Sequence, residues 1–299
     1  MSTKHSPKIF PVVSLLISST LWGIAWFPLR FLEIHGLQGL WTSVLIYSVP
    51  ALLGSYLLIQ HRNAIASQGG WLMLIAVCNG WCNVAFILAV LDGNVMRVLL
   101  LFYLSPLWAT LLAWLILKEH MSRLAVVTLV IAMCGAMVML WDPSLGWPWP
   151  KGHADWLAIT SGMTFALANV SVRKTQGIAI PVKNLFSWLG VSALSIAWIV
   201  LGDLPAPTAS STVLLWTVLT GPIVVFVMTF TVQYGVTKLP VYRSAVILLF
   251  ELVAGAVSSQ LLTDEVMGLN EWIGGGFIVL AAYLSARAYV HDPTKSISE

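Results

Sequence analysis

The sequence predicts an all-α integral membrane protein with ten transmembrane helices, built as two inverted five-helix repeats. Three observations support this fold class. Of the 299 residues, 59% are hydrophobic and only 9% are charged, whereas about 25% of the residues in a soluble domain are charged. The apolar residues gather in runs of about 20, the length that a helix needs to cross the hydrocarbon core of a bilayer. Finally, the two halves of the chain resemble each other weakly.

Ten apolar runs lie between the charged residues and the turn residues of the chain. We expect each run to form one membrane-spanning helix. The connections between them are short, so no soluble domain of ordinary size fits between two spans, and function must lie inside the helix bundle. The expected spans cover residues 10–29, 40–59, 71–91, 97–117, 122–141, 154–173, 184–202, 212–234, 241–262 and 271–290.

The basic residues predict the orientation of the bundle. An even number of spans places both termini on one side, and Lys and Arg are enriched in cytoplasmic connections. With cytoplasmic termini, all of the 15 Lys and Arg residues except Arg30, Arg97 and Lys151 fall on the cytoplasmic side, Lys183 among them. We therefore predict cytoplasmic termini. The net charge of +3 is explained by this distribution and does not indicate a nucleic-acid partner.

A weak internal repeat relates the two halves. A shift of 146 residues places Arg97 on Arg243 and Glu119 on Glu265, at the two ends of matched spans. Because each copy holds an odd number of spans, the second copy enters the membrane from the opposite side. Inverted repeats of this kind are typical of secondary transporters. We interpret the four charged residues as ordinary solvated helix ends, with ion pairs at each mouth as the alternative.

The repeat divides the chain into two helical units and a connection. The predicted units are residues 1–141 and residues 154–299, with five helices in each. Residues 142–153 between them are rich in Pro and Trp, and Trp is enriched where a chain meets the membrane surface. We therefore interpret residues 142–153 as an interfacial linker.

Segments in both halves resemble a known family. Trp22, Gly23 and Pro28 in the first span, the segment "YLSPLWATLLAWLILKEHMS" and the segment "LLTDEVMGLNEWIGGGFIVLAAY" are similar to the EamA-type, ten-helix branch of the drug/metabolite transporter superfamily. The resemblance implies a five-plus-five inverted repeat around a central substrate cavity. It also implies movement of small metabolites, amino acids or drugs, often outward across the inner membrane. We therefore expect a multi-pass protein of the cell inner (cytoplasmic) membrane.

The chain departs from this family's pattern in its ninth span. Members commonly carry a Glu followed directly by a Pro, but here Glu251 is followed by Leu252. The matching pair in the first half is Ser105 and Pro106. The chain thus keeps the proline in one repeat and the glutamate in the other, which leaves open whether the ninth span has a hinge.

Glu251 is the strongest candidate for a functional residue. It lies near the middle of the ninth span, ten residues from both Val241 and Leu261. An acid at this depth costs about 2.5–3.5 kcal/mol on insertion scales, so we expect it to face a cavity or a partner rather than lipid. Ser244 and Ser258, seven residues to either side, share its helix face. Glu251 could carry a proton, pair with a cationic or amino group of the substrate, or form a structural hydrogen bond to another helix.

Deep aromatic and amide side chains are further candidates. Aromatic faces bind cations or stack on flat solutes, although helix packing explains such residues equally well. Asn side chains inside spans usually hydrogen-bond a neighbouring helix. The predicted substrate or proton pathway comprises Glu251, Tyr103, Trp22, Ser105, Trp26, Asn79, Asn83, Trp81, Asn169, Ser244 and Ser258.

These features predict a secondary transporter rather than an enzyme. We expect export of small organic metabolites such as amino acids by alternating access, with proton coupling through Glu251 as one option. The alternatives are an exporter of cationic drugs or quaternary amines, and an uptake facilitator. A membrane-embedded enzyme is less favoured, because no other acid or histidine lies at the depth of Glu251, which has no evident His or Cys partner. The expected partners are a small-molecule substrate, the lipid bilayer and protons, without a cofactor, metal or nucleic acid. The sequence does not indicate the oligomeric state.

Overall fold

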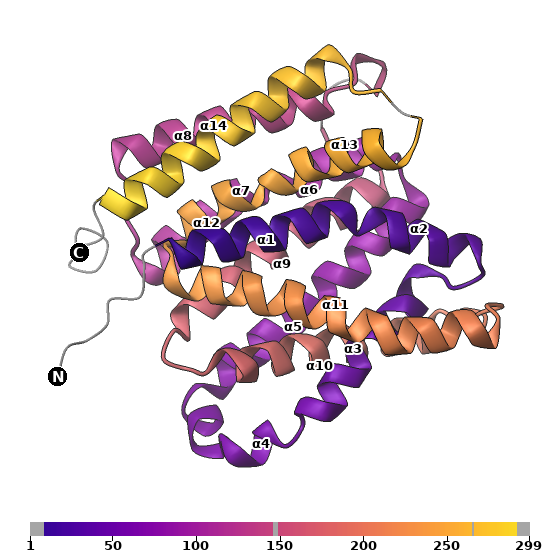
Figure 1. Cartoon of the computed structure of the whole chain (residues 1–299). Helices are drawn as coiled ribbons and strands as arrows, with labels where there is room; N and C mark the ends of the chain where they lie inside the picture. The colour runs from indigo at the N-terminus through magenta and orange to yellow at the C-terminus, as the bar shows by residue number, and fades with distance from the viewer. Residues whose placement is uncertain (1–8, 146–148, 265, 292–299) are drawn as a thin grey trace.

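The computed structural model describes residues 9–145, 149–264 and 266–291, and within these ranges the chain forms helices and turns without a strand. Figure 1 shows the helices packed side by side in one bundle. Eight helical segments in the described ranges are long and apolar enough to cross a membrane. The prediction of an all-α, multi-pass membrane chain is therefore confirmed.

Five of the eight segments are single helices, and three consist of two or three helical pieces that follow each other across a break. The single helices are α5 (Arg62–Asp92), α8 (Arg123–Leu140), α10 (Ile180–Leu201), α11 (Ser211–Lys238) and α14 (Leu269–His291). The interrupted segments are α1 (Phe10–Ile24) with α2 (Trp26–Ile34), α6 (Val95–Phe102) with α7 (Ser105–Leu112) and the π-helical turn η1 (Ala113–Leu117), and α12 (Val241–Leu248) with α13 (Phe250–Leu262).

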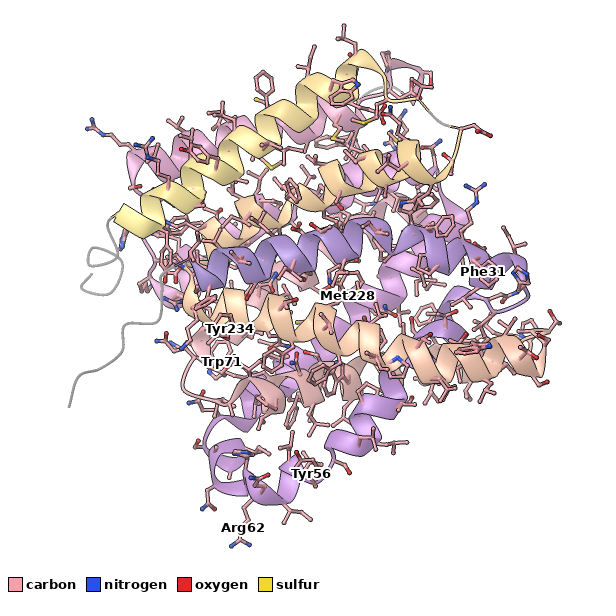
Figure 2. The ribbon with its side chains drawn as sticks, in the orientation of Figure 1. Phe31, Tyr56, Arg62, Trp71, Met228 and Tyr234 are labelled. Atoms are coloured by element: carbon pink, nitrogen blue, oxygen red, sulfur yellow. The ribbon has the colours of Figure 1, made fainter. Side chains whose placement is uncertain are left out.

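Two further helices occupy the expected spans 40–59 and 154–173. The first, α3 (Gly39–Gly54), is apolar but has only 16 residues, and the short helix α4 (Leu57–Gln60) follows it. Arg62, just after α4, projects from one end of the bundle (Figure 2). The second, α9 (His153–Lys174), has 22 residues but a more polar sequence.

The predicted linker is described in part. Pro143–Leu145 form a short 3-10 helix, η2, and His153 already belongs to α9. Residues 146–148 lie outside the described residues.

Three of the membrane segments are interrupted, and a proline follows two of the breaks. Pro28 follows the break at Ala25, and Pro106 follows the break at Tyr103. Proline lacks an amide hydrogen and so removes one helical hydrogen bond. The third break, at Leu249, has no proline nearby; there the amide of Leu252 donates to the carbonyl of Leu249 at 3.0 Å, a tighter 3-10 turn. The ninth expected span is therefore interrupted without the proline of the family pattern.

The helices pack around α9, which contacts α5, α6, α7 and α11. On one side α1 lies along α11, where the hydroxyl of Ser18 donates to the carbonyl of Met228 at 3.1 Å (Figure 2). Helices α8 and α14 pair along one edge of the bundle (Figure 1).

Small residues bring α1 and α13 into close contact beside Glu251. A Cβ atom on Gly23 would lie 2.5 Å from the carbonyl oxygen of Glu251 and 2.7 Å from the Cβ of Ala254. Only glycine fits this position without a shift of the backbone. Contacts through small residues are typical of membrane helices, which gain van der Waals energy when their backbones approach closely. Glu251 therefore lies where α13 is held against α1.

Candidate functional site

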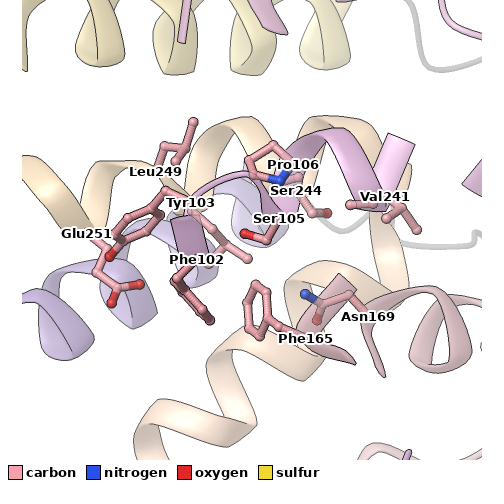
Figure 3. A pocket seen from close by; sticks show the side chains of 13 residues that line it. Phe102, Tyr103, Ser105, Pro106, Phe165, Asn169, Val241, Ser244, Leu249 and Glu251 are labelled. Carbon is pink, nitrogen blue, oxygen red and sulfur yellow. The ribbon is translucent and has the colours of Figure 1, made fainter. Parts of the chain in front are cut away.

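A small pocket with a mainly apolar lining lies where the breaks in α6–α7 and α12–α13 meet beside α9 (Figure 3). Its volume is about 20 Å³, enough for a water molecule but far below the roughly 300–1,000 Å³ of a pocket for an organic ligand. The pocket therefore holds no more than water in this structure. The lining residues are Phe102, Tyr103, Ser105, Pro106, Ala109, Phe165, Asn169, Val241, Ser244, Ala245, Leu248, Leu249 and Glu251.

Glu251 and Tyr103 form one end of the pocket. Tyr103 lies at the break after α6 and is 6% exposed, and Glu251 lies in the first turn of α13. The phenolic hydroxyl of Tyr103 donates a hydrogen bond to the Glu251 carboxylate, and the two side chains point toward each other in Figure 3. The positive end of the α13 dipole also favours a carboxylate at this position. The break at Tyr103 and the break at Leu249 thus position the Glu251 carboxylate.

The opposite end of the pocket carries uncharged polar groups. Ser105 is 5% exposed, and its hydroxyl has no hydrogen-bond partner among the described residues. The amide of Asn169 from α9 likewise has no partner in the described ranges, whereas the Ser244 hydroxyl donates to the carbonyl of Pro240 at 3.2 Å. Buried polar groups are normally satisfied. The Ser105 and Asn169 groups are therefore available to water or to a solute in the pocket.

Aromatic rings line the space between the two ends. The ring centroids of Phe102 and Phe165 are 5.8 Å apart, and the rings of Phe102 and Tyr103 pack edge to face at 5.2 Å. Aromatic faces attract cations and pack against apolar solutes. The pocket lining therefore combines a single charged group, the Glu251 carboxylate, with aromatic walls and free hydrogen-bonding groups.

Two predicted pathway residues, Trp26 and Ser258, meet about two helical turns beyond Glu251 along α13. The indole N–H of Trp26, at the start of α2, donates to the Ser258 hydroxyl at 2.9 Å. This bond joins α2 to α13, next to the contact between α1 and α13 at Gly23. Trp22, one turn earlier in α1, is partly buried and does not line the pocket.

Three other predicted residues lie on α5, away from the pocket. The Asn79 amide donates to the Ser187 hydroxyl at 3.2 Å, and the Trp81 indole donates to the Thr160 hydroxyl at 3.3 Å. The carbonyl oxygen of Asn83 is buried and has no partner among the described residues. Asn79 and Trp81 thus hydrogen-bond across helices. Of the eleven predicted residues, the structure brings Glu251, Tyr103, Ser105, Asn169 and Ser244 to one pocket.

The interpretation of Arg97 and Glu119 as solvated helix ends is wrong. Arg97 forms a buried ion pair with Asp155 at 2.9 Å, and Glu119 pairs with Arg173 at 3.2 Å. Both partners belong to α9, whose two ends pack against the two ends of the α6–η1 segment. A comparison of repeat positions does not reveal partners that lie on another helix. Glu265 lies outside the described residues.

The buried Arg97–Asp155 pair predicts a loss of stability when Asp155 is replaced by Asn. The exposed fractions of the two side chains are 10% and 8%. Removing one member of a buried pair leaves an uncompensated charge and costs about 3 kcal/mol. We expect Asp155→Asn to lower the unfolding temperature in detergent. Asp92→Asn, at an exposed site, should leave the temperature nearly unchanged, and equal unfolding temperatures for the two variants would contradict the prediction.

Lys183 is a buried residue that the sequence did not reveal. We expected it on the cytoplasmic side with the other basic residues, but its exposure is 0% in the first turns of α10. Its ammonium donates to the Thr237 hydroxyl at 2.6 Å and to the carbonyl of Val172 at 3.3 Å. The ends of α9 and α11 converge on α10 there and cover the side chain. A single Lys near the start of an apolar run gives no signal of such burial.

Known proteins similar to the chain are named as transporters. Residues 9–141 match the EamA-like transporter family. The uncharacterized transporter PA0485 of Pseudomonas aeruginosa is 24% identical over 226 residues, 70% of each chain. The uncharacterized transporter YojE of Bacillus subtilis is 25% identical over 186 residues, 58% of each chain and so less than two thirds of that relative.

A solved protein crystal structure has a similar fold. Its TM-score is 0.70 at 17% identity, and the match covers 92% of this chain and 97% of that chain. At this identity the likeness shows the fold alone. The apolar helices show a multi-pass membrane protein, and residues 9–141, just under half of the chain, are similar to the EamA-like transporter family.

Proposed function

We propose that the chain is a secondary transporter that exports small organic metabolites, such as amino acids, across the cell inner membrane by alternating access. One observation carries the proposal: two interrupted helices meet at a pocket whose single charge is the Glu251 carboxylate. Transporters commonly build their substrate sites from such interrupted helices near the bilayer midplane. In this proposal the small volume of about 20 Å³ belongs to a closed state between two open ones.

We further propose ten spans in two inverted repeats, with α3 and α9 as the two spans beyond the eight apolar segments. The helix bounds support the repeat. The same shift of 146 residues relates the start of α6 at Val95 to the start of α12 at Val241, and the start of α8 at Arg123 to that of α14 at Leu269. It also relates the break at Tyr103 to the break at Leu249.

The packing of the helices supports the same relation. Helix α1 contacts α11 and the interrupted pair α12–α13, whereas α9 contacts α5 and the interrupted pair α6–α7. If α1 corresponds to α9 and α5 to α11, these two sets of contacts exchange under a twofold axis. Such an axis, lying in the membrane plane, would relate the two half-bundles. Rocking one half-bundle against the other would then interconvert an inward-open and an outward-open form. The termini then lie together in the cytoplasm.

The pocket chemistry supports a substrate with an amino group. Glu251 can pair with an ammonium, while the free groups of Ser105 and Asn169 can hydrogen-bond the other end of the solute. The same carboxylate can hold a proton when the substrate is absent, so competition between the two would couple export to a proton gradient. The rings of Phe102 and Phe165 favour the alternative, a quaternary amine or cationic drug.

A counterflow screen in proteoliposomes tests the proposed function. Purified protein would be reconstituted and loaded with amino acids, polyamines or quaternary cations, and uptake of the labelled solute measured at two pH values. We expect trans-acceleration by solutes with an amino group and a dependence on pH. Acceleration by quaternary cations alone would favour the alternative substrate class. Transport only of anions without an amino group would contradict both assignments.

A further inference from the structure

A second small pocket lies where α8 and α12 begin and α14 ends, and none of its lining residues lines the Glu251 pocket. Its volume is about 10 Å³, room for one oxygen-sized group. The lining residues are Ser122, Leu124, Ala125, Thr128, Arg243, Ser285 and Ala288. Arg243 is the only charged residue among them.

The charge of Arg243 is not neutralised by any described acid. Its Nη1 atom is buried and makes no hydrogen bond within the described ranges, and its guanidinium carbon lies 5.9 Å from the ring centres of Tyr242 and Tyr289. Glu119, whose carboxylate accepts from the amide of Val241 at the start of α12, pairs with Arg173. Arg243 is only partly buried, but its buried Nη1 atom lacks the hydrogen-bond acceptor that a buried polar group normally has. Among the described residues the site therefore lacks an anion.

Arg97 lies at the equivalent place in α6 and, unlike Arg243 among the described residues, has an acidic partner. Arg97 is the third residue of α6, as Arg243 is the third residue of α12. Arg97 has Asp155 as its ion-pair partner at 2.9 Å. For Arg243 the described part of the chain supplies rings and hydroxyls instead of a carboxylate.

The hydroxyl groups of the pocket can hydrogen-bond an anion. Ser285 is 3% exposed and has no hydrogen-bond partner among the described residues. The Ser122 oxygen accepts from the amide of Ala125 at 3.2 Å, which leaves its own hydrogen free to donate. The pocket has room for one phosphate oxygen, which a guanidinium and two hydroxyl donors can hold, and charge-assisted hydrogen bonds of this kind are the strong ones.

The surroundings of the pocket favour a phosphate that belongs to a lipid. Helices α8 and α14 form an edge of the bundle (Figure 1), and their outer residues are apolar and exposed, such as Val126 at 47% and Tyr283 at 59%. Acyl chains would cover these faces in a bilayer. A headgroup beside the helix ends would then lie next to Arg243, as basic pockets between membrane helices bind anionic headgroups.

We propose that the Arg243 pocket binds a phosphate group, carried by an anionic phospholipid or free in solution. The binding site is separate from the Glu251 pocket and does not depend on the proposed transport function. The phosphate would neutralise the charge of Arg243 and accept hydrogen bonds from Ser122 and Ser285.

Native mass spectrometry of the purified full chain tests the site. Bound lipid would be counted after addition of phosphatidylglycerol or phosphatidylcholine, with and without inorganic phosphate. We expect selective retention of phosphatidylglycerol, weakened by about tenfold in Arg243→Ala, because a charge-assisted hydrogen bond contributes on that scale. Ser285→Ala should weaken it less, and this milder variant keeps the test valid if Arg243→Ala does not fold. Displacement by inorganic phosphate would identify the free ion as a second source.

Arg123→Ala is the matched control, because Arg123 is exposed at the same end of α8 but does not line the pocket. It should leave the retention of phosphatidylglycerol at the wild-type value. The proposal is overturned if Arg243→Ala and Ser285→Ala both retain phosphatidylglycerol as the wild type does, or if phosphatidylcholine binds equally well.

Discussion

Replacing Glu251 with Gln should lower substrate counterflow by on the order of 100-fold, the scale of losing one member of a buried charge pair. Gln has nearly the same shape and can still accept the hydrogen bond from Tyr103, so the fold of the pocket is preserved. What the variant loses is the only charge in the pocket lining. An ammonium then has no counter-charge, and no proton can be carried at this position. The measurement is counterflow in proteoliposomes at two pH values.

Glu271→Gln is the control for this experiment. Glu271 lies in the first turn of α14 and accepts from the amide of Gly268 at 2.7 Å, outside the pocket. An amide oxygen can accept the same bond, so we expect counterflow close to that of the wild type. If Glu251→Gln also transported at the wild-type rate with the same pH dependence, both functional roles of Glu251 would be eliminated and only a structural role would remain.

Replacing Gly190 with Ala should strongly destabilise the bundle. A Cβ atom at this position in α10 would overlap the backbone carbonyl of Ala76 in α5. On the other side of the contact, Gly80 of α5 faces the Gly190 carbonyl. Because neither backbone can move without separating two long helices, we expect a loss of about 3 kcal/mol, the upper range for overpacking. Thermal unfolding in detergent measures the effect.

Gly276→Ala provides the matched comparison. Gly276 also lies inside a helix, α14, but a Cβ atom there would have no neighbouring atom within 4 Å. Alanine has the higher helix propensity, so this variant should unfold at the wild-type temperature or slightly above it. Similar unfolding temperatures for Gly190→Ala and Gly276→Ala would show that α5 and α10 do not pack through glycine.

The positions of the helices could be predicted from the sequence because a bilayer demands long apolar runs. Spans expected at 122–141 and 241–262 correspond to α8 and to α12 with α13. The breaks in the helices were harder to predict from the sequence. Pro28 and Pro106 follow two of them, but Leu249 marks the third break without a proline. That break depends on a local 3-10 hydrogen bond, for which an apolar sequence carries no signal.

Only part of the candidate site could be predicted from the sequence. Glu251 could be found because an acid inside an apolar run is costly at any orientation of the helix. The partners of Arg97 and Glu119 could not, because Asp155 and Arg173 come from α9, and no periodicity encodes which helix packs on which. Lys183 was missed for the same reason.

The central claim, that the pocket between the two broken helices is the transport path, is tested most directly by a thiol at Ser105. In a chain whose three native cysteines are replaced, Ser105→Cys places the thiol where the free hydroxyl faces the pocket. Right-side-out and inside-out vesicles would be treated with a polar, membrane-impermeant thiol reagent, with and without a solute active in counterflow. We predict labelling from both sides and protection by the solute. A transport-active variant that is never labelled, or is labelled equally in the presence of the solute, would contradict the claim.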